Sequence, residues 1–414
     1  MAKKFLLKLL VVVATITLVA VGCGNDDDDA APEPAPATEA PTPEPEPMDE
    51  EPMDEDTMDE EPMDEEPMEE EPMEEEPMGD EVVAAFIYVG PPGDAGWTWA
   101  HDQGRLFAED QTGATTLFVA SVPEVAEDFR AVAVDFIENE GADVIFATSF
   151  GYMDPMLELA GEYPDVVFEH ASGYKMNDTN FGNYFGRMYQ PRYLSGMAAG
   201  AITEANQIGY VAAFPIPEVL RGINAFTLGA QRVNPDVEVH VTWTFTWFDP
   251  AVEGDSAAAL LEAGADVIAM HQDSTAPGIA AQEAGARWVS YNSDMSAFAP
   301  DAFITAPVWN WGPYYARIID AVASGTYSPG AYWGGMADGI VALAPLADDV
   351  PADVAAEIDE VAAQLTDGSW DVFTGEIRDQ DGNVVVAEGE TMDDGSMLGM
   401  SFFVEGVVGD ADPS

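Results

Sequence analysis

The sequence predicts an α/β fold of two similar lobes, each a parallel sheet flanked by helices. Beyond residue 81, apolar strands alternate with helical stretches, which is the βαβ rhythm of a parallel sheet. A second series of strands begins near residue 207, and the segment GADVI occurs at 141–145 and again at 264–268. Both copies follow a predicted helix and open a predicted strand, so the second half of the chain repeats the first.

The first 23 residues have the pattern of a lipoprotein signal peptide. Lys3, Lys4 and Lys8 precede and enter an apolar run that ends at Cys23, the only cysteine in the chain. A single cysteine excludes internal disulfides and stands where lipid would be attached. Ala20 replaces the usual leucine of the lipidation motif, so a plain secretory signal and an uncleaved membrane anchor remain alternatives. We expect a protein held by lipid at the extracytoplasmic face of the cell membrane.

Residues 24–80 are expected to form a disordered acidic tether. Methionine occurs every five residues from Met48 to Met78. Each except Met78 is followed directly by acidic residues and, apart from the one that follows Thr57, each is preceded by proline. Dense proline prevents helix and sheet, and like charges repel, so the segment should be extended and solvated. Binding of copper by thioethers or of calcium by carboxylates is an alternative that nothing in the repeat fixes in space.

The net charge of −65 extends into the folded part of the chain. From Glu81 onward there are about 51 acidic residues against 10 basic ones, and Lys175 is the only lysine. This composition excludes nucleic acid as a partner, since such binding needs basic patches. Self-repulsion of this strength is screened only by concentrated salt, which indicates adaptation to a saline environment.

The segment 84–105 joins the first strand to the first helix of the fold. Residues 82–89 are short, apolar and rich in β-branched and aromatic side chains, as in a strand buried on both faces. After a Gly-Pro-Pro-Gly turn, Trp97, His101 and Arg105 share one face of a helix. Ligands bind at the carboxyl ends of such strands, so we expect this loop to form one wall of a site. Ordinary core aromatics are the alternative.

The remaining elements follow in order along both halves. Further strands are predicted at 115–122, 143–148, 166–171, 207–214, 237–245, 266–270 and 288–291, with helices that include 124–139 and 314–324. We expect lobe 1 at 81–204, with a returning segment at about 310–340. Lobe 2 should comprise 205–309 and part of the 341–414 tail. Strand ends that face one another across the two lobes would line a cleft.

Several motifs together resemble the basic membrane protein family of ABC-transporter substrate-binding lipoproteins, which includes purine-nucleoside receptors. They are GDAGW at 93–97, FGYMD at 150–154, YFGR at 184–187, IGYV at 208–211, PEVLRGIN at 217–224, NSD at 292–294 and FVEGVVG at 403–409. The match spans roughly 81–408. It implies a two-lobed type I periplasmic-binding protein fold with a hinge of crossing segments. It also implies a purine as ligand and a permease and ATPase as partners, without cofactor, for a protein that we expect to be a monomer.

The resemblance also implies a set of ligand-binding residues. These are Asp94, Trp97, Trp99, His101, Phe150, Asp154, Phe214, Arg221, Asn224, Asp273, Asn292, Asp294 and Trp309. Asp94 would bind the edge of the base, Trp97 or Trp99 would lie on one ring face, and Phe214 would lie on the other. For each carboxylate taken alone, a solvated surface position is the alternative.

Two departures from the family pattern bear on the ligand. Asn292 stands where nucleoside receptors have an acid, and Trp309 stands where they have a lysine near the sugar hydroxyls. Loss of these charges favours a free base such as adenine or guanine over a nucleoside.

Three functions other than transport of a purine are conceivable for this sequence. The sequence has four histidines without metal-type spacing and no nucleophile-elbow, Walker or dinucleotide motif, so we expect no enzyme and no metal site. An extracellular sensor on the same fold and a binder of a sugar-like ligand remain alternatives. A permease and ATPase encoded beside the gene would favour transport over sensing.

Overall fold

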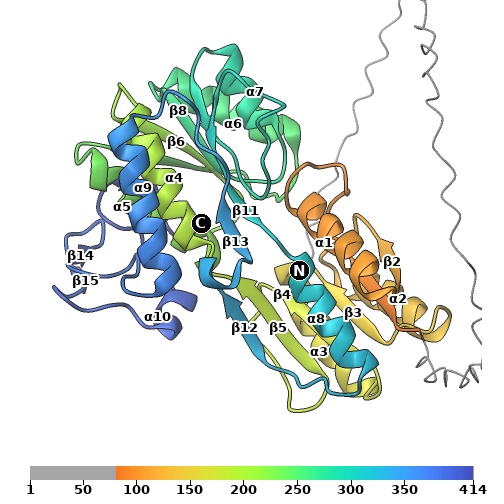
Figure 1. The fold of residues 1–414 in the computed structure, drawn as a ribbon. Coiled ribbons are helices and arrows are strands. Elements are labelled where there is room, and N and C mark those ends of the chain that lie inside the picture. Colours follow the sequence, from red (N-terminus) through yellow and green to blue (C-terminus); the bar gives the residue numbers. More distant parts are fainter. Residues whose placement is uncertain (1–80, 414) are drawn as a thin grey trace, which may run out of the picture. The chain divides into compact units, whose positions relative to one another are not determined.

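The computed structural model describes residues 81–413. The predicted signal peptide, the predicted lipidation of Cys23 and the predicted tether with its metal-binding alternative therefore lie outside the described residues. Within the described part, the predicted two-lobed α/β fold is confirmed: two six-stranded parallel sheets are each flanked by helices (Figure 1).

The first sheet has the strand order β12-β5-β4-β3-β1-β2, and every neighbouring pair is parallel. Its strands are β1 (Val83–Ile87), β2 (Thr115–Val119), β3 (Val144–Ala147), β4 (Val167–Ala171), β5 (Phe181–Gly186) and β12 (Ala331–Gly334). Its helices are α1 (Trp97–Thr112), α2 (Ala126–Glu138), the 3₁₀ turn η1 (Phe150–Tyr152), α3 (Met153–Glu162) and α8 (Gly312–Ala323). Alternate residues of β1 divide between two cores: Ala84 and Phe86 pack with α1 and α8, while Ala85 and Ile87 pack with α2 and α3. Burial on both faces explains the continuous apolar runs of these strands.

The second sheet repeats this arrangement with the strand order β10-β9-β8-β6-β7-β16. Its strands are β6 (Gln207–Ala212), β7 (Glu238–Trp243), β8 (Val267–His271), β9 (Arg287–Val289), β10 (Phe303–Thr305) and β16 (Val407–Val408). Helices α6 (Pro250–Glu262) and α7 (Ala276–Glu283) cover one face, and α4 (Tyr189–Ile202), α5 (Pro217–Val233) and α9 (Ala352–Asp367) lie on the other. The tail adds the hairpin β14 (Ile377–Arg378) and β15 (Val384–Val386), and the short helix α10 (Asp394–Leu398).

Three segments cross between the two lobes. The chain passes from β5 to α4, returns from β10 through β11 (Pro307–Trp309) to α8, and crosses again from β12 through the 3₁₀ turn η2 (Met336–Asp338) to β13 (Val341–Leu343). Strands β11 and β13 pair antiparallel and lie between the two sheets in Figure 1. Several crossings of this kind let lobes hinge while keeping them together.

The structure differs from the expected lobe boundary at residue 204. Helix α4 precedes that boundary, yet it packs against α5 and α9 of the second lobe. The first crossing therefore falls at 187–188, directly after β5, because α4 supplies an apolar face to the second sheet. The segment expected to return at 310–340 contributes α8 and β12, and β12 pairs with β5 of the first sheet.

Candidate ligand-binding site

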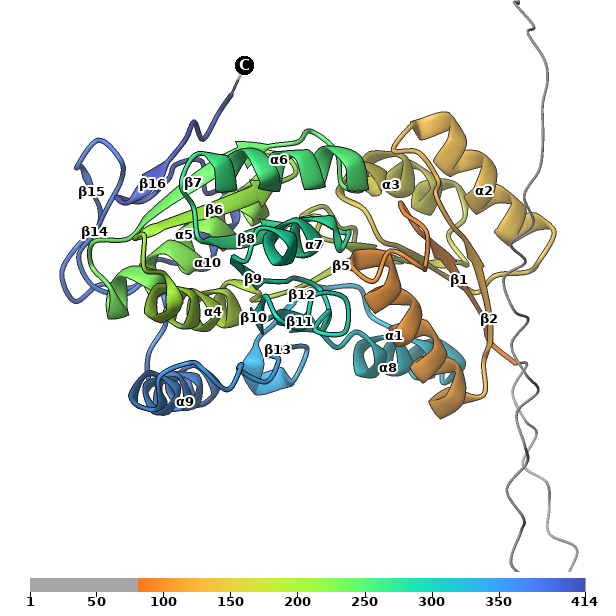
Figure 2. The same ribbon diagram turned by 90° about the horizontal axis from the view of Figure 1, so that it is seen from above.

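A cavity lies between the two lobes at the carboxyl ends of the strands. It is lined by Val89, Trp97, Ser149, Phe150, Ser172, Glu218, Trp247, His271, Asp273 and Tyr291. All of these residues end a parallel strand or follow one closely, as expected for a ligand site in open α/β sheets (Figure 2 shows both sheets). Each lobe supplies one wall.

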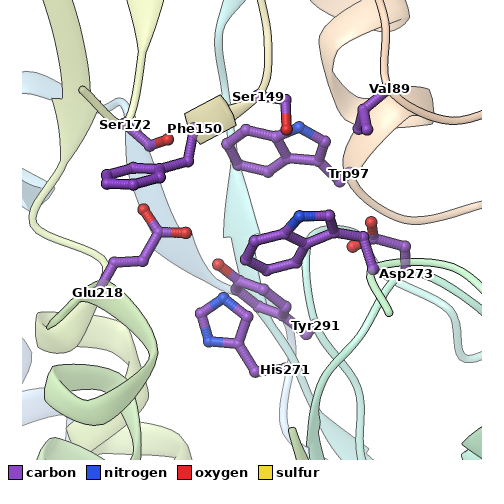
Figure 3. A pocket seen from close by; sticks show the side chains of 10 residues that line it. Val89, Trp97, Ser149, Phe150, Ser172, Glu218, His271, Asp273 and Tyr291 are labelled. Carbon is purple, nitrogen blue, oxygen red and sulfur yellow. The ribbon is translucent and has the colours of Figure 1, made fainter. Parts of the chain in front are cut away.

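Each wall of the cavity carries two large aromatic side chains. Trp97 and Phe150 belong to the first lobe, while Trp247 and Tyr291 belong to the second. Figure 3 shows Trp97 and Phe150 on the opposite side of the cavity from Tyr291. The indole nitrogen of Trp97 donates to the carbonyl of Thr148 at 2.6 Å, which fixes the plane of the ring. The cavity therefore has aromatic side chains on both sides.

Two carboxylates reach the cavity from the second lobe. Burial raises the pKa of Glu218 to about 7, although Arg221 partly opposes this. Burial also raises the pKa of Asp273 well above its usual range, and the nearby charges of Asp94 and Glu253 raise it further. Both shifts favour the protonated carboxyl, which both donates and accepts hydrogen bonds.

His271 completes the polar lining. Burial lowers the pKa of its imidazole well below the usual value, and the charges of Arg192 and Arg221 lower it further. The ring is therefore neutral where a free histidine would titrate. Its centre lies 4.5 Å from the centre of the Tyr291 ring.

Asn292 and Trp309 support Asp273 from behind. The Asn292 amide donates to Asp273 at 3.0 Å and accepts the indole N–H of Trp309, also at 3.0 Å. Trp309 in turn stacks on Trp311 with ring centres 4.4 Å apart. Neither Asn292 nor Trp309 lines the cavity, but together they fix the orientation of the carboxylate that does.

The two lobes touch beside the cavity. A Cβ atom added to Gly96, at the start of α1, would lie 2.3 Å from the backbone oxygen of Asp273. The hydroxyl of Ser293 donates to the carbonyl of Ala95 in the opposite lobe. Glycine at position 96 is therefore required for the approach of the first lobe to the loop that carries Asp273.

A larger space adjoins the cavity, with which it shares Phe150, Ser172 and Glu218. Its wall includes Asn183, Tyr332, Trp333 and Leu398. Arg221 also lines it: this buried guanidinium donates to the carbonyl of Met397 at 2.8 Å and lies over the Trp333 ring. Burial lowers the pKa of Arg221 to about 10, and the charge of Glu218 opposes the shift.

Three residues expected near the ligand instead shape helix α1. The Asp94 carboxylate accepts the backbone N–H groups of Gly96, Thr98 and Trp99 at 2.8, 2.9 and 2.9 Å, so it is committed to the helix start. Trp99 is 39% exposed and does not line the cavity, whereas Trp97 does. His101 is buried, stacks on Trp311 and meets Trp97 edge-on.

Four other expected residues lie elsewhere in the fold. Asp154 pairs with Lys175 with its side chain 68% exposed, and Asp294 is exposed and accepts the backbone N–H of Ser296. Asn224 holds the tail by donating to the carbonyl of Phe402 and accepting the N–H of Val404. Phe214 is half-buried and packs on Trp247 at 5.0 Å between ring centres, but it does not line the cavity.

Of the thirteen expected residues, the structure brings Trp97, Phe150 and Asp273 together in the cavity and places Arg221 in the adjoining space. The expectation omitted Glu218, Trp247, His271 and Tyr291. Each of these ends or follows a strand of the second sheet, so the strand-end rule applied to every strand would have found them. Among the described residues, no cluster of side chains could hold a metal ion.

Comparison with known proteins identifies the family. The family model described as ABC transporter substrate-binding protein PnrA-like (Bmp) matches residues 81–366. The chain belongs to this PnrA-like family. Its members are the substrate-binding components of ABC transporters, which are extracytoplasmic proteins and not a class of enzymes. The resemblance noted in the sequence is confirmed.

Two relatives of this PnrA-like chain carry different ligand names. A purine-binding protein of Brucella abortus is 44% identical over 324 residues, which cover 78% of this chain and 91% of the relative. A protein of Haloferax volcanii, named as an ABC transporter glucose-binding protein, is 42% identical over 334 residues, covering 80% and 81%.

Solved structures agree on the fold. A solute-binding protein of an ABC transporter from Aeropyrum pernix has a TM-score of 0.63 at 18% identity, covering 72% of this chain and 93% of its own. Another from Conexibacter woesei has a TM-score of 0.58 at 22% identity, covering 70% and 98%. In the part of the chain from 81 to 413, no helix combines the length and apolar character needed to span a bilayer.

Proposed function

We propose that this protein captures a purine between its lobes and delivers it to the permease of an ABC importer, without chemical change. The observation that carries the proposal is the pair of aromatic walls: Trp97 and Phe150 face Tyr291 across a cavity whose polar groups lie around them. Every purine has a π-face, and stacking on an aromatic side chain contributes about 1–3 kcal/mol per base. The similarity to the Brucella purine-binding protein supports the same ligand.

Glu218, Asp273 and His271 would select among purines by hydrogen bonding to the ring edge. The earlier preference for a free base over a nucleoside is weakened by the adjoining space, because a ribose attached to the ring would have room to enter it. We therefore include both adenine or guanine and their nucleosides in the proposal.

The direct experiment is native mass spectrometry of protein purified without added ligand, followed by calorimetry with adenine, guanine, their nucleosides and glucose. A purine mass and tighter binding of purines than of glucose are expected. A carbohydrate mass with no purine binding would overturn the proposal. Incubated nucleosides should be recovered intact, whereas release of free base would indicate a nucleosidase.

The helix α1 provides a matched pair of variants. Trp97→Ala should weaken purine binding at least tenfold, since a tenfold loss corresponds to about 1.4 kcal/mol and stacking contributes as much. Trp99→Ala removes the same side chain two residues away on the exposed face and should leave affinity unchanged. Equal affinity in the parent and Trp97→Ala proteins would refute the stacking model.

A sugar-like ligand is the second candidate, because the Haloferax relative is named as glucose-binding. Carboxylates and aromatic faces also suit sugar hydroxyls and ring C–H groups. The calorimetric series separates the two candidates, since a glucose site should bind glucose and reject adenine.

The mode of attachment to the membrane is part of the proposal. We infer that Cys23 carries the lipid and that the protein acts as a monomer. Mass spectrometry of the membrane-extracted protein should show an acyl adduct on the peptide that begins at Cys23, and Cys23→Ser should abolish it. Light scattering of residues 81–414, expressed without the preceding residues and measured without detergent, should give the mass of one chain.

A further inference from the structure

Behind the second-lobe wall of the cavity lies a buried arginine that no carboxylate neutralises among the described ion pairs. Arg192, on α4, is fully buried, and its guanidinium carbon lies 3.6 Å from the centre of the Tyr291 ring. One of its amino groups donates to the carbonyl of Met270 at 2.6 Å. Its Nε and second amino group have no hydrogen-bond partner within residues 81–413. An unpaired buried cation is costly, which indicates a role beyond packing.

His271 is the polar group next to this arginine. Its Nδ1 is buried and has no hydrogen-bond partner in the described structure. Its Nε2 is not buried in this way, and the ring lines the cavity. A Cβ atom added to Gly222 would lie 3.6 Å from both Arg192 Nε and His271 Nδ1. Arg192 Nε and His271 Nδ1 therefore border the same small space beside Gly222, and the Nε2 edge is left for the cavity.

We propose that Arg192 is a positioning residue that holds His271 neutral with its proton on Nε2. His271 then offers the cavity a hydrogen-bond donor for an acceptor atom of the ligand, such as a ring nitrogen or a carbonyl oxygen. The reason is geometric. The guanidinium presents only N–H donors, so a proton on Nδ1 would add a second unpaired donor to the buried space that Arg192 Nε already borders. A doubly protonated ring would place two cations side by side in a buried region.

The other charged and titratable groups around the ring are consistent with this state. Arg221 and Glu218 face it from α5, Asp273 follows it in the same loop, and Tyr291 packs on it from the end of β9. Below about pH 7, burial favours the uncharged form of both carboxyls, so there they do little to draw a second proton onto the imidazole. The arginines act in the opposite sense and keep the ring neutral.

The arrangement sets the polarity of the site. His271 donates, while Glu218 and Asp273 accept or donate according to their protonation. A ligand that places a hydrogen-bond acceptor beside a donor on one planar edge fits this set. The tautomer itself does not depend on the ligand being a purine, so its test is separate from that of the proposed function.

The experiment is long-range proton–nitrogen NMR of the ligand-free full chain with isotope-labelled histidine. The chain has four histidines, and the loss of one signal set in His271→Gln assigns His271. The expected result is a neutral ring protonated at Nε2 from about pH 8 to about pH 5.5, the range in which a free histidine titrates. Protonation at Nδ1, or titration near the free value, would overturn the proposal.

Two substitutions separate a positioning role from a structural one. Arg192→Met should raise the pKa of His271 and allow the Nδ1-protonated form, whereas Arg192→Lys should retain the parent tautomer. Arg232→Met removes a surface arginine of the same lobe, paired with Glu357, and should change nothing at His271. The signals of buried His101 and His170 report whether each variant is folded. An unchanged His271 tautomer and pKa in folded Arg192→Met would contradict the role of Arg192.

Discussion

Glu169, on strand β4, is a buried carboxylate away from the ligand cavity. Its two oxygens accept the hydroxyls of Tyr314 and Tyr327, each at 2.7 Å. Burial raises its pKa to about 7, and the tyrosine hydrogen bonds and the charge of Arg317 only partly oppose the shift. Because the pKa is higher in the folded than in the unfolded chain, ionisation of Glu169 opposes folding.

The sign of the pH dependence follows directly. Glu169 should not oppose folding below the unfolded pKa of about 4.3, and stability should fall as the pH rises from there to about 7. Glu169→Gln, which keeps an acceptor and a donor for the two tyrosines, should therefore be more stable than the parent at pH 8 by on the order of 3 kcal/mol. Urea denaturation at pH 5 and pH 8 measures the difference between the two proteins.

Glu162→Gln is the matched control, because Glu162 is exposed on α3 and pairs with Arg130. Its stability difference from the parent should be small at both pH values, as for most surface ion pairs. If Glu169→Gln and the parent had the same free energy of unfolding at pH 8, ionisation of Glu169 would not limit stability.

At the level of single residues, sequence reasoning located the loops of the site better than the side chains that line it. Trp97 and Asp273 were identified because their residue types are conspicuous at strand ends. Asp94 and Asn224 have equally suitable chemistry, but backbone groups use up their hydrogen-bonding capacity. Such local satisfaction depends on three-dimensional partners, and residue spacing alone does not show it.

Helix α1 begins at Trp97, and its amino terminus bears on the geometry of the site. Asp94 accepts three backbone N–H groups of the first turn, the groups that a helix cannot satisfy internally. The same turn carries Trp97 into the cavity. The position of the Trp97 ring therefore depends on the Asp94 carboxylate.

Asp94→Ala should lower the free energy of unfolding by about 1–2 kcal/mol, the usual effect of losing a helix cap. Ligand affinity should fall in parallel, because Trp97 loses its fixed position. Thermal denaturation and calorimetry on the same samples test both effects. Asp294→Ala, which removes an exposed carboxylate once expected in the cleft, should change neither. A loss of affinity without a loss of stability in Asp94→Ala would instead indicate direct contact with the ligand.

Elements with strong periodicity were predictable, and short connecting elements were not. The expected strands at 82–89 and 207–214 correspond to β1 and β6, and the expected helix at 124–139 corresponds to α2. Strand β5 was not predicted, since its sequence FGNYFG mixes two glycines and an asparagine with aromatics. It is a strand because β4 and β12 pair with it on either side, and such tertiary pairing overrides weak β-propensity.

At the scale of the whole molecule, the two-lobed fold followed from the repeated βαβ rhythm, whereas the assignment of α4 did not. A helix next to a crossing can pack on either lobe, and only the apolar surface offered by α5 decides it. The excess of acidic residues, in contrast, follows from the sequence alone.

The charge of the chain predicts how its stability responds to salt. Raising NaCl from about 0.1 M to about 1 M shortens the Debye length from about 10 Å to about 3 Å, which screens repulsion among the acidic side chains. The melting temperature should rise over this range, as measured by calorimetry at fixed pH. Unchanged or falling stability would remove the proposal of adaptation to a saline environment.

The contact between Gly96 and the backbone of Asp273 has a consequence for how long a ligand stays bound. Release requires the lobes to separate, so residence time depends on how completely they come together. The added methyl group of Gly96→Ala would clash with the backbone of Asp273 and hold the lobes apart, without altering any side chain that lines the cavity. Stopped-flow measurements should show faster dissociation with little change in association. Gly93→Ala, where an added methyl group meets nothing within 4 Å, should behave like the parent. The absence of a side chain at position 96 would then help to set the rate at which the ligand is released.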